Sequence, residues 1–169
     1  MFLESLYEFV YRWIRQSRLG QYAKFHGYSF CREDADNSIS FSGDIFDRNP
    51  SKEYKFSNAA NIIQGSAQGL SFTYFEKTLI EDVGGSKEEP VATRSIIAID
   101  SLSSEHFESG EAFDKDLTFY RENGGICFWW RGTGSSSEKA IPVKKLEQWL
   151  ADIASTFKTE VAKAALIHE

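Results

Sequence analysis

The sequence predicts an α+β domain in which an antiparallel β-sheet is flanked by an N-terminal helix and a long C-terminal helix. Strand-length segments separated by turns fill residues 61–100, which is typical of a β-meander. Apolar residues recur at helical spacing near both ends of the chain. We therefore expect a meander and further hairpins to form one sheet of about five to seven strands, with the helices packed on it.

The composition is that of a folded protein with a sizeable core. The chain has 169 residues, of which 41% are hydrophobic and 15% aromatic, enough for one domain without disulfide or metal staples. The net charge is −6, whereas a general nucleic-acid binder needs a basic surface that displaces counterions from phosphates. We therefore expect no nucleic-acid partner.

Residues 1–27 are expected to form an amphipathic helix that precedes an α+β domain over residues 28–169. Charged residues interrupt the segment too often for a membrane span, and Glu4 and Glu8 are unlike the basic start of a signal peptide. Gly27 is a suitable C-terminal stop for the helix. The apolar positions at helical spacing are Leu3, Leu6, Tyr7, Val10, Trp13 and Ile14.

Two interpretations of this helix remain open. It can pack on the sheet of its own domain, as most amphipathic helices do. Alternatively, it can lie on a partner protein or at a membrane surface, because Trp13 and nearby arginines suit an interfacial helix. Glu4 and Glu8 argue against the membrane, so packing on the domain or contact with a partner protein is preferred. Peripheral membrane contact is the alternative. The interaction surface predicted in this way comprises Leu3, Leu6, Val10, Trp13, Arg12 and Arg15.

The strands of the domain are predicted from alternation and turn residues. An acidic, Gly-containing segment at residues 81–90 is expected to be a solvated loop. Asn123-Gly124 predicts a tight hairpin turn, because both positions favour a positive φ. The expected strands are residues 28–32, 53–57, 61–67, 70–80, 93–100, 117–121 and 126–131. Residues 38–42 are either another strand or an extended arm.

The C-terminal helix begins after Pro142, and its apolar stripe includes Trp149 and Phe157. Such a stripe implies docking on the sheet. An aromatic pocket on the sheet is a second possible binding site. Its predicted lining is Phe72, Tyr74, Phe128 and Trp130.

Sequence motifs for catalysis or cofactor binding are lacking. Cys31 and Cys127 are far apart, and no Cys/His pair has zinc-site spacing, so we expect no metal. The Gly/Ser-rich residues 132–137 lack the lysine of a phosphate loop, and no dinucleotide fingerprint is present. No nucleophile has an identifiable base, and His106 and Cys127 have simpler structural explanations. We therefore expect a protein that is not an enzyme and has no cofactor.

Three segments carry a resemblance to a known family. They are YAKFHGY at residues 22–28, ANIIQGSAQGLSFTYFE at residues 60–76, and the hairpin of residues 117–131 with the helix after it. In these segments the chain resembles a widespread group of uncharacterised bacterial proteins related to the DUF3137 group. The resemblance implies a cytosolic α+β domain behind a membrane-anchored N-terminus, and no known reaction or catalytic residues. This chain lacks the transmembrane segment, so its N-terminal helix is a candidate substitute.

Together these features predict a non-enzymatic protein-interaction or binding module. We expect it in the cytoplasm, with attachment to a membrane periphery or a larger complex as an option. The alternatives are a small-ligand binder that uses the aromatic pocket, and an enzyme of unrecognised type. A flat apolar patch would favour the interaction module, and a deep apolar cavity would favour the ligand binder.

Overall fold

The computed structural model describes residues 2–36, 38–39, 53–67, 69–84, 87–99, 112–114, 117–122, 125–130 and 142–167. The α+β class with an antiparallel sheet is confirmed. In chain order, the helix α1 (Phe2–His26) precedes the described strands and the helix α2 (Val143–Ile167) follows them. The strands are β1 (Ser29–Glu33), β2 (Glu53–Phe56), β3 (Ala60–Ala67), β4 (Leu70–Gly84), β5 (Lys87–Ile99), β6 (Ala112–Asp114), β7 (Leu117–Glu122) and β8 (Gly125–Trp130).

The described strands form a single sheet of eight, more than the sequence predicted. Its main order is β1-β3-β4-β5-β8-β7-β6, and β2 pairs with the outer part of β4. Every described pairing is antiparallel. The predicted meander is confirmed as β3-β4-β5, and the predicted second hairpin as β7-β8. The turn residues Asn123 and Gly124 lie outside the described residues.

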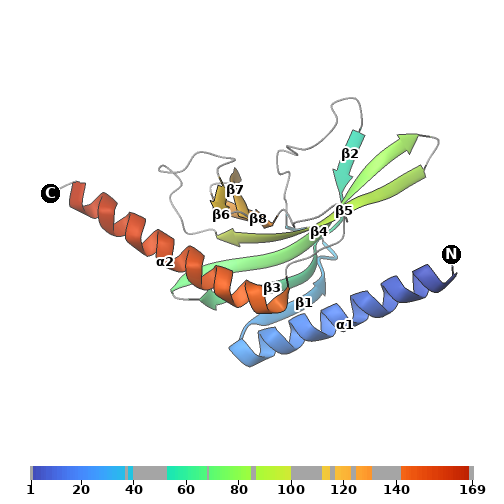
Figure 1. Ribbon diagram of the computed structural model, residues 1–169, viewed down its shortest axis with the longest axis horizontal. Coiled ribbons are helices and arrows are strands. Elements are labelled where there is room, and N and C mark those ends of the chain that lie inside the picture. The colour runs from blue at the N-terminus through green and yellow to red at the C-terminus, as the bar shows by residue number, and fades with distance from the viewer. Residues whose placement is uncertain are drawn as a thin grey trace.

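The prediction that the acidic residues 81–90 form a solvated loop is wrong. β4 continues to Gly84 and β5 begins at Lys87, so the two strands form a long hairpin arm that projects from the sheet (Figure 1). Asp82 lies opposite Glu88 within this arm. Backbone hydrogen bonds hold an antiparallel pair together whatever its side chains are, so polar composition alone did not exclude strands.

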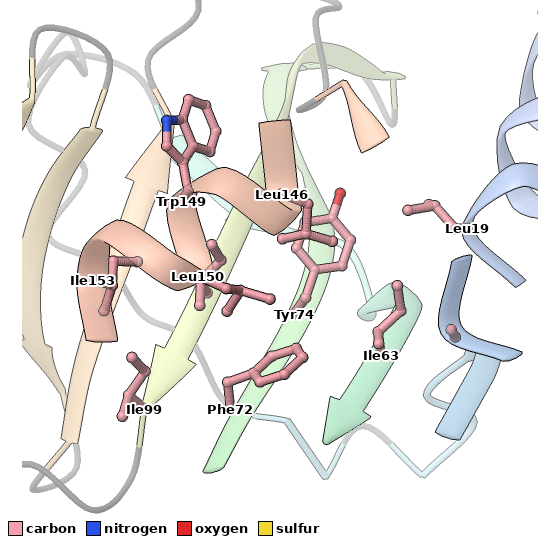
Figure 2. Close-up of a cluster of buried hydrophobic side chains, with 11 residues drawn as sticks. Leu19, Ile63, Phe72, Tyr74, Ile99, Leu146, Trp149, Leu150 and Ile153 are labelled. Carbon is pink, nitrogen blue, oxygen red and sulfur yellow. The ribbon is translucent and has the colours of Figure 1, made fainter. Parts of the chain in front are cut away.

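Both helices lie on the same face of the sheet, and α1 contacts β1 and β3 (Figure 1). The principal core lies between this face and the helices. Leu146 and Leu150 of α2 cover Phe72 and Tyr74 of β4, with Ile63 of β3 beside them (Figure 2). Trp149 also belongs to this core, which confirms that the first half of α2 docks on the sheet. The side chain of Phe157 lies outside the described residues.

A smaller cluster occupies the opposite face, where Phe75 and Ile96 are buried and Ile39 packs against them. Hydrogen bonds with Asp34 and Lys77 hold residues 38–39 in place, and we call these contacts the Asp34 clasp. Asp34 accepts hydrogen bonds from the backbone N–H of Ile39 at 2.8 Å and from the hydroxyl of Ser38 at 2.9 Å. The Lys77 ammonium donates to the Ile39 carbonyl at 2.8 Å. Of the strand or extended arm predicted at residues 38–42, residues 40–42 lie outside the described residues.

The transition from α1 to β1 depends on glycine. Gly27 has φ +72°, a conformation that side chains disfavour, and it follows the last residue of α1, as predicted. The chain then returns so that Tyr28 packs over Gly65 of β3. A β-carbon at Gly65 would lie 2.2 Å from the Tyr28 ring, so the close packing of the two segments requires glycine there.

Candidate interaction surface

The helix α1 carries buried apolar residues on one side and exposed apolar residues on another. Leu19 and Ala23 are fully buried against the sheet. At about 100° per residue, Leu6 lies roughly 180° around the helix from Arg15, and Trp13 about 160° away in the other sense. The sheet-facing side begins at Arg15 and continues through Leu19 and Ala23. The predicted stripe through Leu6 and Trp13 therefore lies on a different side of the helix from Leu19 and Ala23, and its side chains are exposed.

We define the outer face of α1 as Leu6, Phe9, Val10 and Trp13. All four side chains are exposed, with 67% of Phe9 and 63% of Trp13 accessible. Four large apolar residues on adjacent helical turns form a contiguous patch, which is unusual unless another surface covers it. The interpretation that this helix packs on the sheet of its own domain therefore holds where Leu19 and Ala23 are buried, whereas Leu6, Phe9, Val10 and Trp13 are exposed.

Arg15 fixes the helix at the boundary between these two halves. Its guanidinium reaches across to β4, where Nε donates to the Glu76 carboxylate at 2.9 Å and Nη2 donates to the same carboxylate. Only 11% of the Arg15 side chain and 5% of the Glu76 side chain is exposed. The prediction that Arg15 belongs to an interaction surface is therefore wrong, because a buried carboxylate holds it on the sheet-facing side.

Further polar groups complete this buried network. Arg15 Nη2 donates to the Tyr74 hydroxyl at 2.9 Å, and the hydroxyl in turn donates to Glu76. Asn61 Nδ2 donates to the other Glu76 oxygen at 2.8 Å, and the Ser95 hydroxyl lies 3.2 Å from that of Tyr74. Asn61 has φ +53° at an irregularity in β3, a conformation that asparagine tolerates better than most residues.

The electrostatics of the network favour one protonation state. Burial and the neighbouring Glu76 raise the pKa of the Tyr74 phenol well above its usual range, so it stays neutral and can donate a hydrogen bond to the carboxylate. Burial by itself lowers the pKa of Arg15, but Tyr74 and Glu76 more than offset this and raise it. The network therefore consists of the neutral Tyr74 phenol beside the buried ion pair of Arg15 and Glu76.

Arginine, tyrosine and glutamate are residue types that also occur in active sites. Here Tyr74 is fully buried and Glu76 nearly so, and both are covered by α1. A substrate in solvent has no direct contact with such groups. The arrangement is suited to holding α1 in a fixed orientation on the sheet.

A groove of about 420 Å³ continues from the outer face of α1 toward the edge of the sheet. Trp13, Gly20 and Lys24 of α1 line one side, and Phe30 and Arg32 of β1 line the other. The remaining lining residues are uncharged polar residues of α1. Gly20 allows the close approach, because a β-carbon there would lie 3.3 Å from the Phe30 ring.

The structure does not assemble the predicted aromatic pocket from Phe72 and Tyr74. Both side chains are buried in the core under α2, because residues that alternate on this face of β4 meet the docked helix (Figure 2). Phe128 pairs with Ile97, which pairs with Tyr74, so the register places Phe128 and Tyr74 on one face of the sheet. The side chains of Phe128 and Trp130 lie outside those described.

Of the predicted interaction residues, Leu6, Val10, Trp13 and Arg12 are exposed, whereas the side chain of Leu3 is not described. Phe9 was not among the predicted residues, although it lies three residues after Leu6 and one turn before Trp13. Phe30 and Arg32 were also overlooked. The sequence shows that Phe30 and Arg32 alternate on a short strand, but it does not show that they lie opposite α1.

Among the residues that the structure describes, no three histidine, cysteine, aspartate or glutamate side chains gather closely enough to hold a metal ion. Neither described helix contains a stretch long and apolar enough to cross a membrane. No protein-family model, curated protein or solved structure matches the chain.

Proposed function

We propose that this chain is a non-enzymatic interaction module that binds another protein through the outer face of α1. The observation that carries the proposal is the division of α1 into two halves. Leu19 and Ala23 anchor the helix on the sheet, while Leu6, Phe9, Val10 and Trp13 form an exposed apolar patch. Contiguous exposed apolar surfaces of this kind are typical of protein–protein contacts.

Charge supports a protein partner over a membrane. A helix that lies on anionic lipid needs several cationic side chains at the headgroup level. Of the three arginines in the first five turns of α1, Arg15 is buried with Glu76 and is unavailable to lipid. Arg12 and Arg18 are exposed but lie on opposite flanks of the helix, about 120° from one another.

We also propose that the chain is related to the DUF3137 group, on the three segments described above. In that case α1 adds a protein-contacting helix to the α+β domain that the resemblance implies. It would then recruit the α+β domain through a protein contact. The proposed site of action is the cytoplasm, at a larger complex.

Site-specific photocrosslinking tests the proposed function. Benzoylphenylalanine replaces Phe9 in one variant and Trp13 in another, and each is irradiated in an extract of the source cells. We expect the same discrete protein adduct from both positions, identified by mass spectrometry. Adding Leu6→Asp should abolish the adduct, because a buried unpaired carboxylate opposes docking.

The matched control places the photoreactive residue at Lys144, an exposed position on α2. It should give no such adduct. An identical pattern from position 144, or no protein adduct from positions 9 and 13, contradicts the proposal. Phospholipid adducts, with binding to anionic vesicles that weakens as salt rises, would identify α1 as a membrane helix instead.

A further inference from the structure

The groove beside α1 adjoins the β1 edge of the sheet, as far as the described residues define it. In the described sheet β1 is the outermost strand and pairs with β3. Ser29, Cys31, Arg32 and Glu33 are all exposed. An edge strand directs the N–H and C=O groups of alternate residues outward, where they are available to pair with another extended chain.

One side of β1 also offers side-chain contacts to such a chain. Phe30 and Arg32 are two residues apart and therefore point to the same face, toward α1. Trp13 and Gly20 lie across the groove from them. A strand added beside β1 would place every second side chain in this groove, between the helix and the edge of the sheet.

The charges of the groove indicate what such a strand carries. Lys24 and Arg32 are the charged residues of the described lining, and both are cationic. Trp13 and Phe30 supply the apolar surface between them. A complementary segment would therefore combine carboxylates with one apolar side chain. A neutral or basic segment would leave both cations without a counter-charge.

We propose that β1 binds an extended acidic segment of a partner protein by strand addition, with its groove-facing side chains held between α1 and β1. This inference rests on the proposed function and names the kind of segment that the partner supplies. A segment with an apolar residue opposite Phe30 and a carboxylate two residues away, opposite Arg32, matches the apolar and cationic lining of the groove. The continuity of the groove with Trp13 lets the rest of the partner cover the outer face of α1.

The test uses the full chain and a defined probe. The probe is a fluorescein-labelled peptide with the sequence serine-glutamate-threonine-leucine-threonine-glutamate-serine, and binding is followed by fluorescence anisotropy. We expect saturable binding that weakens as salt is raised. A matched peptide with lysine in place of both glutamates should bind at least tenfold more weakly.

Two N-methylated versions of the acidic peptide report on backbone pairing. One is methylated on every second amide and the other on the intervening amides. Because only alternate amides of an added strand face the edge, one version should lose binding at least tenfold while the other retains it. Equal affinities for the two versions, or equal losses, would overturn strand addition.

Protein variants locate the site. Lys24→Glu combined with Arg32→Glu should weaken binding of the acidic peptide at least tenfold, whereas Lys144→Glu on α2 should leave it unchanged. Both variants are first checked for a native melting temperature. If Lys144→Glu weakens binding as much as the double variant, the groove is not the site and the inference fails.

Other occupants give different results. Sedimentation that shows concentration-dependent self-association, abolished by Lys24→Glu with Arg32→Glu, would make a second copy the occupant and overturn the peptide proposal. The two proposals fail separately. If position 9 gives no protein crosslink, the proposed interaction module is contradicted. If the crosslink is retained but the peptide does not bind, only the proposed strand addition is contradicted.

Discussion

Arg15 of α1 and Glu76 of β4 form a buried ion pair that joins residues 61 positions apart in the sequence. The pair lies where the docked half of α1 meets its exposed half. It therefore determines which side of the helix faces the sheet. Leu6 and Trp13, on another side of the helix, are exposed.

The effects of replacing Arg15 and Glu76 on the free energy of unfolding should be strongly non-additive. Arg15→Leu leaves Glu76 charged and nearly buried without its main partner, so we expect a loss of about 3–5 kcal/mol in urea unfolding. Arg15→Leu combined with Glu76→Leu should recover most of that loss, since no buried charge remains. Arg12→Leu is the exposed control and should change stability by about 0.5 kcal/mol or less. Additive losses in the double variant would contradict a direct coupling.

The two faces of α1 should differ in their contribution to stability. Leu19→Ala removes a fully buried side chain and should cost about 2–5 kcal/mol, because it leaves a cavity in the principal core. Trp13→Ser, on the outer face, should change stability by about 0.5 kcal/mol or less in the isolated chain. Thermal and urea unfolding of both variants provide the measurement. A large loss for Trp13→Ser would show that the outer face is covered within the protein itself.

A methyl group at Gly65 should disturb the packing of Tyr28. Tyr28 also stacks on His26 and contacts Phe72 edge to face, so its ring is constrained on several sides. We expect Gly65→Ala to cost about 1–3 kcal/mol in unfolding free energy, as overpacking does elsewhere. Ser66→Ala, at the neighbouring exposed position, serves as the control. If Gly65→Ala is as stable as the wild type, Tyr28 is not held against β3.

The Asp34 clasp should make part of the stability depend on pH. Hydrogen bonds from Ile39 and Ser38 hold the pKa of the Asp34 carboxyl below its usual range despite some burial. Its folded pKa is lower than its unfolded pKa, so its contribution is complete above about pH 4 and disappears as pH falls through the folded value. Asp34→Asn should therefore be less stable than the wild type at pH 7.

Urea unfolding of both proteins at pH 7, 5 and 3 checks this prediction. The difference between them should persist at pH 5 and shrink at pH 3. Asp152→Asn, at an exposed position of α2, controls for the general loss of negative charge. A stability difference that stays constant down to pH 3 would show that Asp34 does not act through its ionised carboxylate.

The elements of this protein followed from local patterns in the sequence. Alternation predicted β3 and the inner part of β4, and Gly27 predicted the end of α1 because few other residues adopt its positive φ. The acidic hairpin arm was missed because turn and strand signals conflict there. Strand pairing depends on backbone hydrogen bonds with a neighbour, and polar side chains do not prevent it.

The sequence by itself determined that Leu6, Val10 and Trp13 share one face of a helix, since that follows from 3.6 residues per turn. Only the tertiary structure decided that this face points outward, because periodicity says which side chains lie together and not what covers them. The same reason explains why Arg15 was assigned to the surface: its partner Glu76 lies on a distant strand. The groove between α1 and β1 likewise exists only after the two elements meet, with Gly20 setting how closely they approach.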